Sequence, residues 1–97
     1  MKKALQLTAD DNVATALEAI EPGDAVEIVL HGAAGPRSVT ALEAIPFGFK
    51  IASRAMARGA TVLKYGHPIA KASSDIAEGA LVHVHNVEGN RGRGDLA

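Results

Sequence analysis

Cysteine is absent from this 97-residue chain, and its aromatic residues are limited to two Phe and one Tyr. The lack of cysteine excludes a disulfide framework and thiol chemistry. With so few rings, the core has to be built from Ala, Val, Ile and Leu, and aromatic surfaces for sugar binding are scarce. The chain also lacks an excess of one charge, because its net charge is −1 and its Lys and Arg residues are scattered until the last few positions. A basic stripe for nucleic-acid binding is therefore excluded.

Long hydrophobic runs are missing as well. The N-terminal stretch MKKALQLTADD carries two lysines but not the apolar run of a signal peptide. No segment approaches the length needed to cross a membrane. We therefore expect a cytoplasmic protein without membrane or nucleic-acid partners. The chain length predicts one domain with a modest core, too small to form a deep cleft by itself.

A stretch near the N-terminus carries the pattern of an amphipathic helix. Thr8 followed by Asp11 is typical of a capping box, and Val13, Leu17 and Ile20 then recur at helical spacing. A Pro-Gly pair comes shortly after this run and would end the helix. The pattern therefore predicts a helix that ends near Ile20.

The rest of the chain is a series of short β-prone runs separated by glycine or proline corners. These runs cover residues 24–32, 37–45, 49–55, 61–66 and 81–87. Many short strands with tight turns are typical of a compact, mostly β fold. The sequence therefore predicts a mainly β domain with one or two short helices.

A spacing of apolar-x-x-Gly-x-x-Val recurs three times, in IEPGDAV, MARGATV and IAEGALV. In each copy the glycine would permit a positive φ at a tight corner, and the valine would open the next strand. The unit is too short for a solenoid. It favours a folded-over β structure whose strands begin after similar corners.

Two histidines lie one residue apart in the stretch LVHVHNV near the C-terminus. The alternation predicts a strand in which Val82 and Val84 face the core. His83 and His85 would then share the opposite face, roughly 6–7 Å apart along the strand, and could converge on one ion or ligand. Asn86 would lie on the valine side and fasten the end of the strand through its amide.

The histidine pair is a candidate for two ligands of a metal ion. Neutral imidazole binds Fe²⁺, Mn²⁺ and Zn²⁺, but a catalytic metal normally has about three protein ligands. A third ligand from this chain could be His67, His31 or an acidic residue, and none of these has diagnostic spacing. An incomplete set indicates that the other ligands lie on a partner chain. The alternative is that His83 and His85 are solvent-exposed strand residues.

Three stretches together resemble a known family: IPFGFKIA (45–52), KYGHPIAKASSDIAEG (64–79) and VHVHNV (82–87). They are similar to the SAF-type domain of the altronate/galactarate dehydratases, which also forms the small subunit of related lyases such as sulfolactate sulfo-lyase. The resemblance runs from about Asp11 to the end of the chain. It implies a β-clip fold over residues 1–88. It also implies a larger catalytic chain that dehydrates sugar acids with a divalent metal, Fe²⁺ or Mn²⁺, shared between the two.

Several residues are expected to have roles at the site. His83, His85 and Lys50 are expected to act in catalysis, and the two histidines are also the expected metal ligands. Lys50, Tyr65 and Asn86 are expected to bind the substrate, with the lysine holding a carboxylate as a point charge. The chain departs from the family at one position.

That departure lies in a turn that usually reads Pro-x-Gly-His-Lys in the family. Here it reads PFGFK, with Phe49 in place of the histidine. We expect the Phe49 ring to point into the active-site cleft and narrow it.

The remaining residues, 89–97, form a stretch rich in glycine that carries Arg91 and Arg93, and we expect a flexible, linker-like tail. Together these features favour the small subunit of an altronate dehydratase-like hydro-lyase, inactive alone and able to form homo-oligomers. One alternative is the small subunit of a sulfolactate sulfo-lyase. Another is a carbohydrate-binding or scaffold β-clip module without catalysis.

Overall fold

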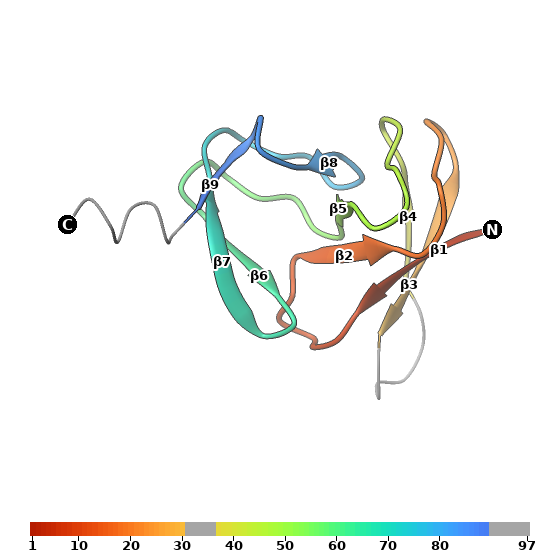
Figure 1. Ribbon diagram of the computed structural model, residues 1–97, viewed down its shortest axis with the longest axis horizontal. Coiled ribbons are helices and arrows are strands. Elements are labelled where there is room, and N and C mark those ends of the chain that lie inside the picture. The colour runs from red at the N-terminus through yellow and green to blue at the C-terminus, as the bar shows by residue number, and fades with distance from the viewer. Residues whose placement is uncertain (31–36, 90–97) are drawn as a thin grey trace.

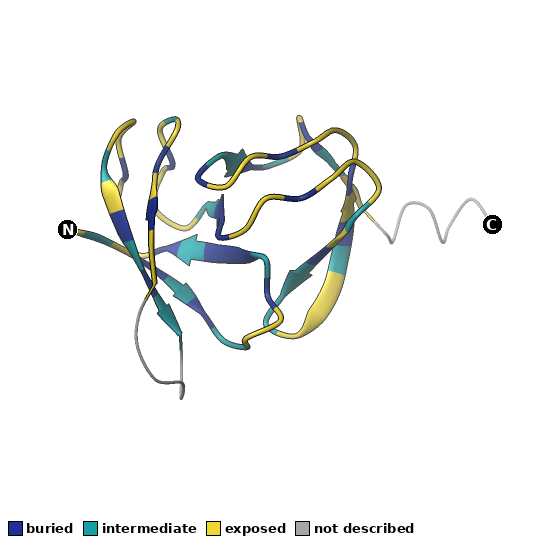
Figure 2. Ribbon diagram, turned by 180° about the vertical axis from the view of Figure 1, so that it is seen from behind, coloured by how far each residue is buried: buried dark blue, intermediate teal, exposed yellow. Residues whose placement is uncertain are grey.

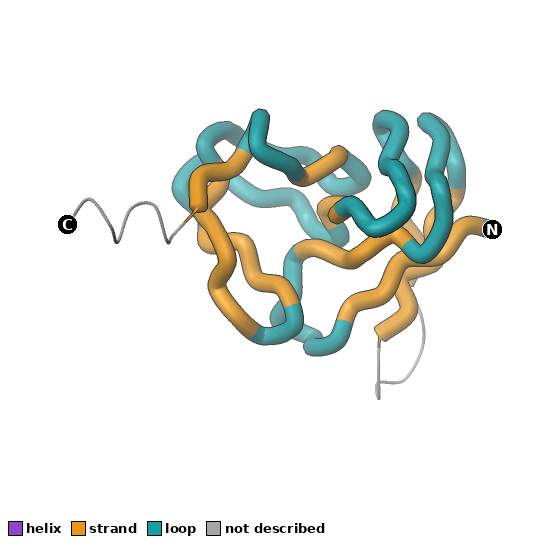
Figure 3. Tube along the Cα trace, viewed as in Figure 1, coloured by secondary structure: helices purple, strands orange, loops and turns teal. Residues whose placement is uncertain are grey.

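The computed structural model describes residues 1–30 and 37–89, and every regular element within them is a strand (Figure 3). The nine strands are β1 (Lys2–Gln6), β2 (Val13–Ala16), β3 (Ala25–Leu30), β4 (Arg37–Thr40), β5 (Lys50–Ala52), β6 (Thr61–Lys64), β7 (His67–Ala72), β8 (Leu81–Val82) and β9 (Val87–Gly89). The predicted β-clip type of fold is confirmed, but without helices in the described part. None of the described residues belongs to a helix long and apolar enough to cross a membrane.

The predicted helix near the N-terminus is wrong. Its centre is β2, which pairs with β1 on one side and with β5 on the other. Val13 and Thr15 are β-branched and fit a pleated strand, so pairing with two neighbours outweighs the helix propensity of Ala14 and Ala16. Leu17, which the helical spacing assigned to a buried face, is 45% exposed.

The strands form two sheets (Figure 1). The larger, curled sheet has the order β4-β3-β1-β2-β5-β8, in which only β1 and β3 run parallel. The smaller sheet has the order β6-β7-β9 and lies toward the end of the molecule opposite the N-terminus. β2 and β5 cross the middle of the molecule and so contribute side chains to the packing on both sides.

The three predicted glycine corners are confirmed, and the structure adds a fourth that the valine-based pattern missed. The fourth corner has Gly48 and is followed by Ile51 in place of a valine. The four corner glycines have φ between 84° and 91°, and each corner leads into a strand: Gly23, Gly48, Gly59 and Gly79. A buried alanine precedes each of the four corners, at Ala16, Ala41, Ala52 and Ala72.

The corners are joined in two pairs by reciprocal backbone hydrogen bonds. In the first pair, the N–H of Gly23 donates to the carbonyl of Ala41 (2.8 Å) and the N–H of Gly48 donates to that of Ala16 (2.9 Å). The second pair repeats this arrangement, with Gly59 donating to Ala72 and Gly79 donating to Ala52, both at 2.8 Å. The fold is therefore two copies of one paired-corner motif.

Each pair of corners surrounds its own apolar cluster, and buried segments alternate with exposed corners in Figure 2. The first cluster contains Ala4, Ala14, Ala16, Ile20, Val26, Ile28, Val39, Ala41, Ile45 and Ile51. The second contains Val13, Ala52, Met56, Val62, Ala70, Ala72, Ile76 and Val82. Neighbouring residues of β2 and β5 point into different clusters, so these two strands form the wall between them.

The two halves also meet at Gly79. Its carbonyl accepts the N–H of Leu42 at 2.9 Å. A Cβ atom added at Gly79 would lie 2.1 Å from the carbonyl oxygen of Thr40. Only glycine permits this approach of one half to the other.

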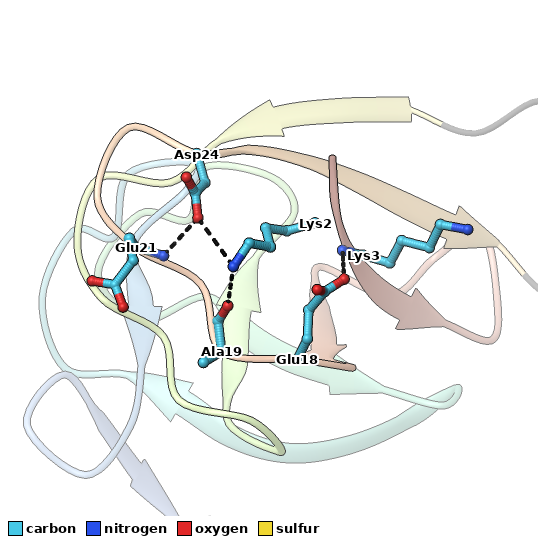
Figure 4. A network of polar contacts seen from close by, with 6 residues as sticks. All are labelled: Lys2, Lys3, Glu18, Ala19, Glu21 and Asp24. Atoms are coloured by element: carbon cyan, nitrogen blue, oxygen red, sulfur yellow. Dashed lines mark hydrogen bonds and ion pairs between the residues drawn. The ribbon is translucent and has the colours of Figure 1, made fainter.

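The start of β1 is fastened to the first corner by a polar network (Figure 4). The ammonium of Lys2 donates to the carbonyl of Ala19 at 2.7 Å and lies 3.7 Å from a carboxylate oxygen of Asp24. The N–H of Lys3 donates to the carboxylate of Glu18 at 3.2 Å. Exposed pairs of this kind contribute roughly 0–1 kcal/mol each, so they orient the strand end more than they stabilise the fold.

Candidate functional site

The histidine pair lies in a tight turn and not along one strand face. β8 ends at Val82, and residues 83–86 form the turn that leads into β9. Val82 is fully buried as predicted, but Val84 is 79% exposed, so its assignment to the core is wrong. The expectation that His83 and His85 share the face of a strand is also wrong.

Asn86 explains why the strand stops early. Its side-chain oxygen accepts the N–H of His83 at 3.0 Å, and its amide nitrogen donates to the carbonyl of Leu81 at 2.8 Å. Its backbone N–H closes the turn by donating to the carbonyl of His83 at 3.0 Å. Asn86 is 8% exposed and has the structural role that the sequence predicts. Its part in substrate binding stays a prediction.

The imidazole of His83 packs against the ring of Phe49 in a tilted arrangement. The two ring centroids are 4.8 Å apart and the planes are inclined by 46°. Phe49 is half-buried and packs against the first apolar cluster. The ring therefore both belongs to the edge of the core and covers one side of His83.

The described part of the chain contains no group of three or more His, Cys, Asp and Glu side chains that could hold a metal ion. His85 is exposed in its turn and His67 is exposed at the start of β7. His31, the other ligand that the sequence offered, lies outside the described residues. His83 and His85 can thus supply two ligands at most to a site completed by another chain, and that role stays a prediction.

Lys50 lies in a separate polar cluster with Tyr65, which the sequence also selected, and with Thr15 and Lys64, which it did not. It sits on β5 directly opposite Thr15 of β2. The hydroxyl of Thr15 is hydrogen-bonded to the hydroxyl of Tyr65 at 3.0 Å. The ammonium of Lys64 lies 5.0 Å from the centroid of the Tyr65 ring. Burial, and then the charge of Lys64, lower the pKa of Lys50 below its ordinary value.

Tyr65 and Gly66 form the two-residue turn between β6 and β7, with φ of 54° and 79°. Positive φ at both central residues is what a type I′ hairpin turn requires, and Asn-Gly is the usual sequence there. A tyrosine in the first position is strained. The backbone N–H groups of Tyr65 and Gly66 donate to the carboxylate of Asp11 at 2.9 and 2.7 Å, which holds the turn in place.

Asp11 is fully buried and accepts five hydrogen bonds, two from this turn and three from Leu7 and Thr8. Burial by itself would raise the pKa of Asp11, but the N–H of Gly66, both donors of Thr8 and the N–H of Tyr65 together lower it. The Thr8–Asp11 contact expected of a capping box does form, but it organises a loop and not a helix.

The register places the polar cluster of Lys50 and the Phe49–His83 contact on opposite faces of the segment that contains β5. Lys50 pairs with Thr15 on one side and Val82 on the other, and Val82 belongs to the second apolar cluster. Phe49, the preceding residue, packs against the first cluster. Neighbouring residues of an extended segment point to opposite faces. The structure therefore joins Tyr65 to Thr15, the residue opposite Lys50, but leaves His83 with Phe49.

Comparison with known proteins gives a match over almost the whole chain. The family model of the altronate/galactarate dehydratase SAF domain matches residues 2–90. Altronate dehydratase of Escherichia coli (strain K12) is 38% identical over 86 residues, which cover 89% of this chain and 16% of that protein. Altronate dehydratase of Bacillus subtilis (strain 168) is 34% identical over 90 residues, 93% of this chain and 17% of that protein.

A shorter relative matches as well. The alpha subunit of (2R)-sulfolactate sulfo-lyase from Paracoccus pantotrophus is 42% identical over 53 residues, which cover 55% of this chain and 79% of that subunit. The matched region thus spans about a sixth of the two altronate dehydratases but most of this subunit.

Proposed function

Since the chain belongs to the altronate/galactarate dehydratase SAF domain family, we propose that it is the SAF component of a sugar-acid dehydratase, a small subunit that completes the active site of a larger catalytic chain. The observation that carries this proposal is the match over residues 2–90 to only 16–17% of two altronate dehydratases. Most of the length of those enzymes lies outside the matched region.

The proposed reaction is the loss of water β to a carboxylate. It requires a base that removes the proton α to the carboxylate and an acid that assists the departing hydroxyl. His83 and His85 are the groups of this chain that would exchange protons with the substrate or hold a divalent cation, Fe²⁺ or Mn²⁺. When bound, that cation would supply Lewis-acid stabilisation of the substrate oxygens. The remaining ligands would come from the catalytic chain.

Lys50 and Tyr65 would hold the substrate. Lys50 is half-buried and carries the compact charge suited to a carboxylate group. Tyr65 offers its hydroxyl beside that of Thr15. Lys50 and Tyr65 lie on one side of β5, and His83 lies on the other. A substrate that contacts all three residues would have to extend around the end of β5. The catalytic chain would bind at the same end.

A sulfo-lyase is the second candidate function, and a specific observation favours it. The sulfolactate sulfo-lyase relative is named as a subunit, and the matched region covers 79% of its length. That relative therefore supports a small separate chain, whereas the altronate dehydratases support dehydration. In a sulfo-lyase, sulfite would leave the substrate in place of water.

Affinity purification of the tagged chain from its own cells tests the proposal. We expect a larger chain related to the remainder of an altronate dehydratase to co-purify in a fixed ratio. Co-purification of a partner related to a sulfo-lyase would instead favour the sulfo-lyase function. Recovery of the chain with no lyase-related partner would favour a binding or scaffold module.

A further inference from the structure

Lys50 and Lys64 are two neighbouring cations without a carboxylate partner among the described residues. Within that part of the chain, the ion pairs join Lys2 to Asp24 and Arg37 to Glu78. Lys50 and Lys64 are both half-buried, and the charge of Lys64 adds to burial in lowering the pKa of Lys50. The charge of Lys64 thus acts on Lys50, and an anion bound between the two would relieve their repulsion.

Two hydroxyl groups accompany these lysines. Thr15 lies directly opposite Lys50 across the strand pair, and its hydroxyl meets that of Tyr65 at 3.0 Å. Tyr65 in turn lies under the ammonium of Lys64. The oxygens of a carboxylate or a sulfonate accept hydrogen bonds from hydroxyl and ammonium groups such as these.

The backbone at Tyr65 indicates that this side chain has a purpose beyond the turn. Its φ of 54° is a conformation that Asn or Gly adopts at lower conformational cost. The buried carboxylate of Asp11 keeps the turn in this conformation. Residues in strained conformations persist where the surrounding structure holds them, and such residues are concentrated at ligand sites.

We propose that Lys50, Lys64, Thr15 and Tyr65 form a binding site for the oxyanion of a small molecule, a carboxylate or a sulfonate. The site is a property of this chain alone. That the anion is the acid group of the substrate rests on the proposed function. The site is built by three segments far apart in the sequence: β2, β5 and the β6–β7 hairpin.

Binding can be measured on the ¹⁵N-labelled full chain by NMR titration at constant ionic strength. The probes are D-gluconate, which carries a carboxylate, and methanesulfonate, with sorbitol as the uncharged control. We expect both anions to cause saturable shifts of the amide signals of Thr15, Lys50 and Tyr65, and sorbitol to cause none. The tighter of the two anions identifies the acid group that the site prefers.

Substitutions then test the site itself. Lys64→Met should weaken anion binding about tenfold, the loss expected when one charged hydrogen-bond donor is removed. Lys71→Met is the matched control, because Lys71 is an exposed lysine on the neighbouring strand β7 and should bind as the wild type does. Tyr65→Phe should weaken binding while keeping the turn, and Lys50→Met serves if the Lys64 variant does not fold.

Three results would overturn the site. The first is a set of amide shifts that do not saturate. The second is a set of shifts of similar size near every lysine of the chain. The third is an equal affinity for the anion in the Lys64→Met and Lys71→Met variants. The titration needs no catalytic chain, so its failure leaves the proposed dehydratase role untouched. Conversely, a failed reconstitution of activity leaves the anion site untouched.

Discussion

The ring of Phe49 lies 4.8 Å from the imidazole of His83, centroid to centroid, and so joins the corner before β5 to the turn after β8. Phe49 stands where the family resemblance expects a histidine. A histidine at this position would face His83 directly and make a pair of imidazoles. In this chain, the position holds the apolar ring of Phe49, which packs on the first apolar cluster and covers one side of His83.

Phe49→Ala should lower the free energy of unfolding by about 1–2 kcal/mol, because it removes a half-buried ring and an aromatic contact. It should also speed the modification of His83 by diethyl pyrocarbonate. Urea unfolding and mass spectrometry measure the two effects. Phe47→Ala is the matched control from the same corner, since Phe47 is 70% exposed, and it should change stability by less than about 0.5 kcal/mol. Equal effects of the two variants would show that the contact between Phe49 and His83 is unimportant.

Asp11 should make the fold sensitive to acid. Its pKa is lowered in the folded protein, so its stabilisation is complete above the unfolded value of about 4 and is lost as pH falls through the lowered folded pKa. Urea unfolding measured from pH 6 downward should show stability that begins to decline as the pH falls below the unfolded pKa of about 4.

Asp11→Asn should be less stable than the wild type by roughly 3 kcal/mol at neutral pH, because an amide cannot accept as a carboxylate does from all five donors. Its acid decline should be shallower. Asp10→Asn, a change at the exposed neighbour, should keep the wild-type decline. An unchanged acid decline in the Asp11 variant would exclude this carboxylate as the cause.

Gly79 and Gly59 occupy equivalent corners but should respond differently to alanine. Both have φ near 90°, at 91° and 88°, so both substitutions strain the backbone by about 1–2 kcal/mol. At Gly79 the new Cβ would also meet the carbonyl oxygen of Thr40 at 2.1 Å, whereas at Gly59 nothing lies within 4 Å. Gly79→Ala should therefore cost at least about 2 kcal/mol more than Gly59→Ala in thermal or urea unfolding. Equal costs would mean that the close approach of the two halves is not required.

The glycine corners were predictable because each one is local. A positive φ, a two-residue turn and a strand that follows are all encoded within seven residues, as in IEPGDAV. The fourth corner escaped the pattern only because Ile51 replaces the valine. The mainly β fold class was predictable for the same reason, because glycine and proline corners separate the short β-prone runs.

The failures come from contacts between distant residues. The alanine-rich segment around β2 becomes a strand because β1 and β5 lie on either side of it. The strand predicted through His83 stops because the amide of Asn86 folds back on it. No sequence pattern marks Thr15 or Lys64 as a site residue, and the fold brings them to the strand pair that carries Lys50 and to Tyr65.

Reconstitution of activity tests the central proposal most directly. If a larger chain is recovered with this protein, it would be assayed for dehydration of altronate with and without the purified small chain. We predict turnover that neither chain shows alone, and a loss of roughly 10²-fold with His83→Ala, as expected for a metal ligand or an acid–base group. Val84→Ala, an exposed apolar change in the same turn, should keep full turnover. Full activity of the larger chain by itself, or normal turnover with His83→Ala, would contradict a shared active site.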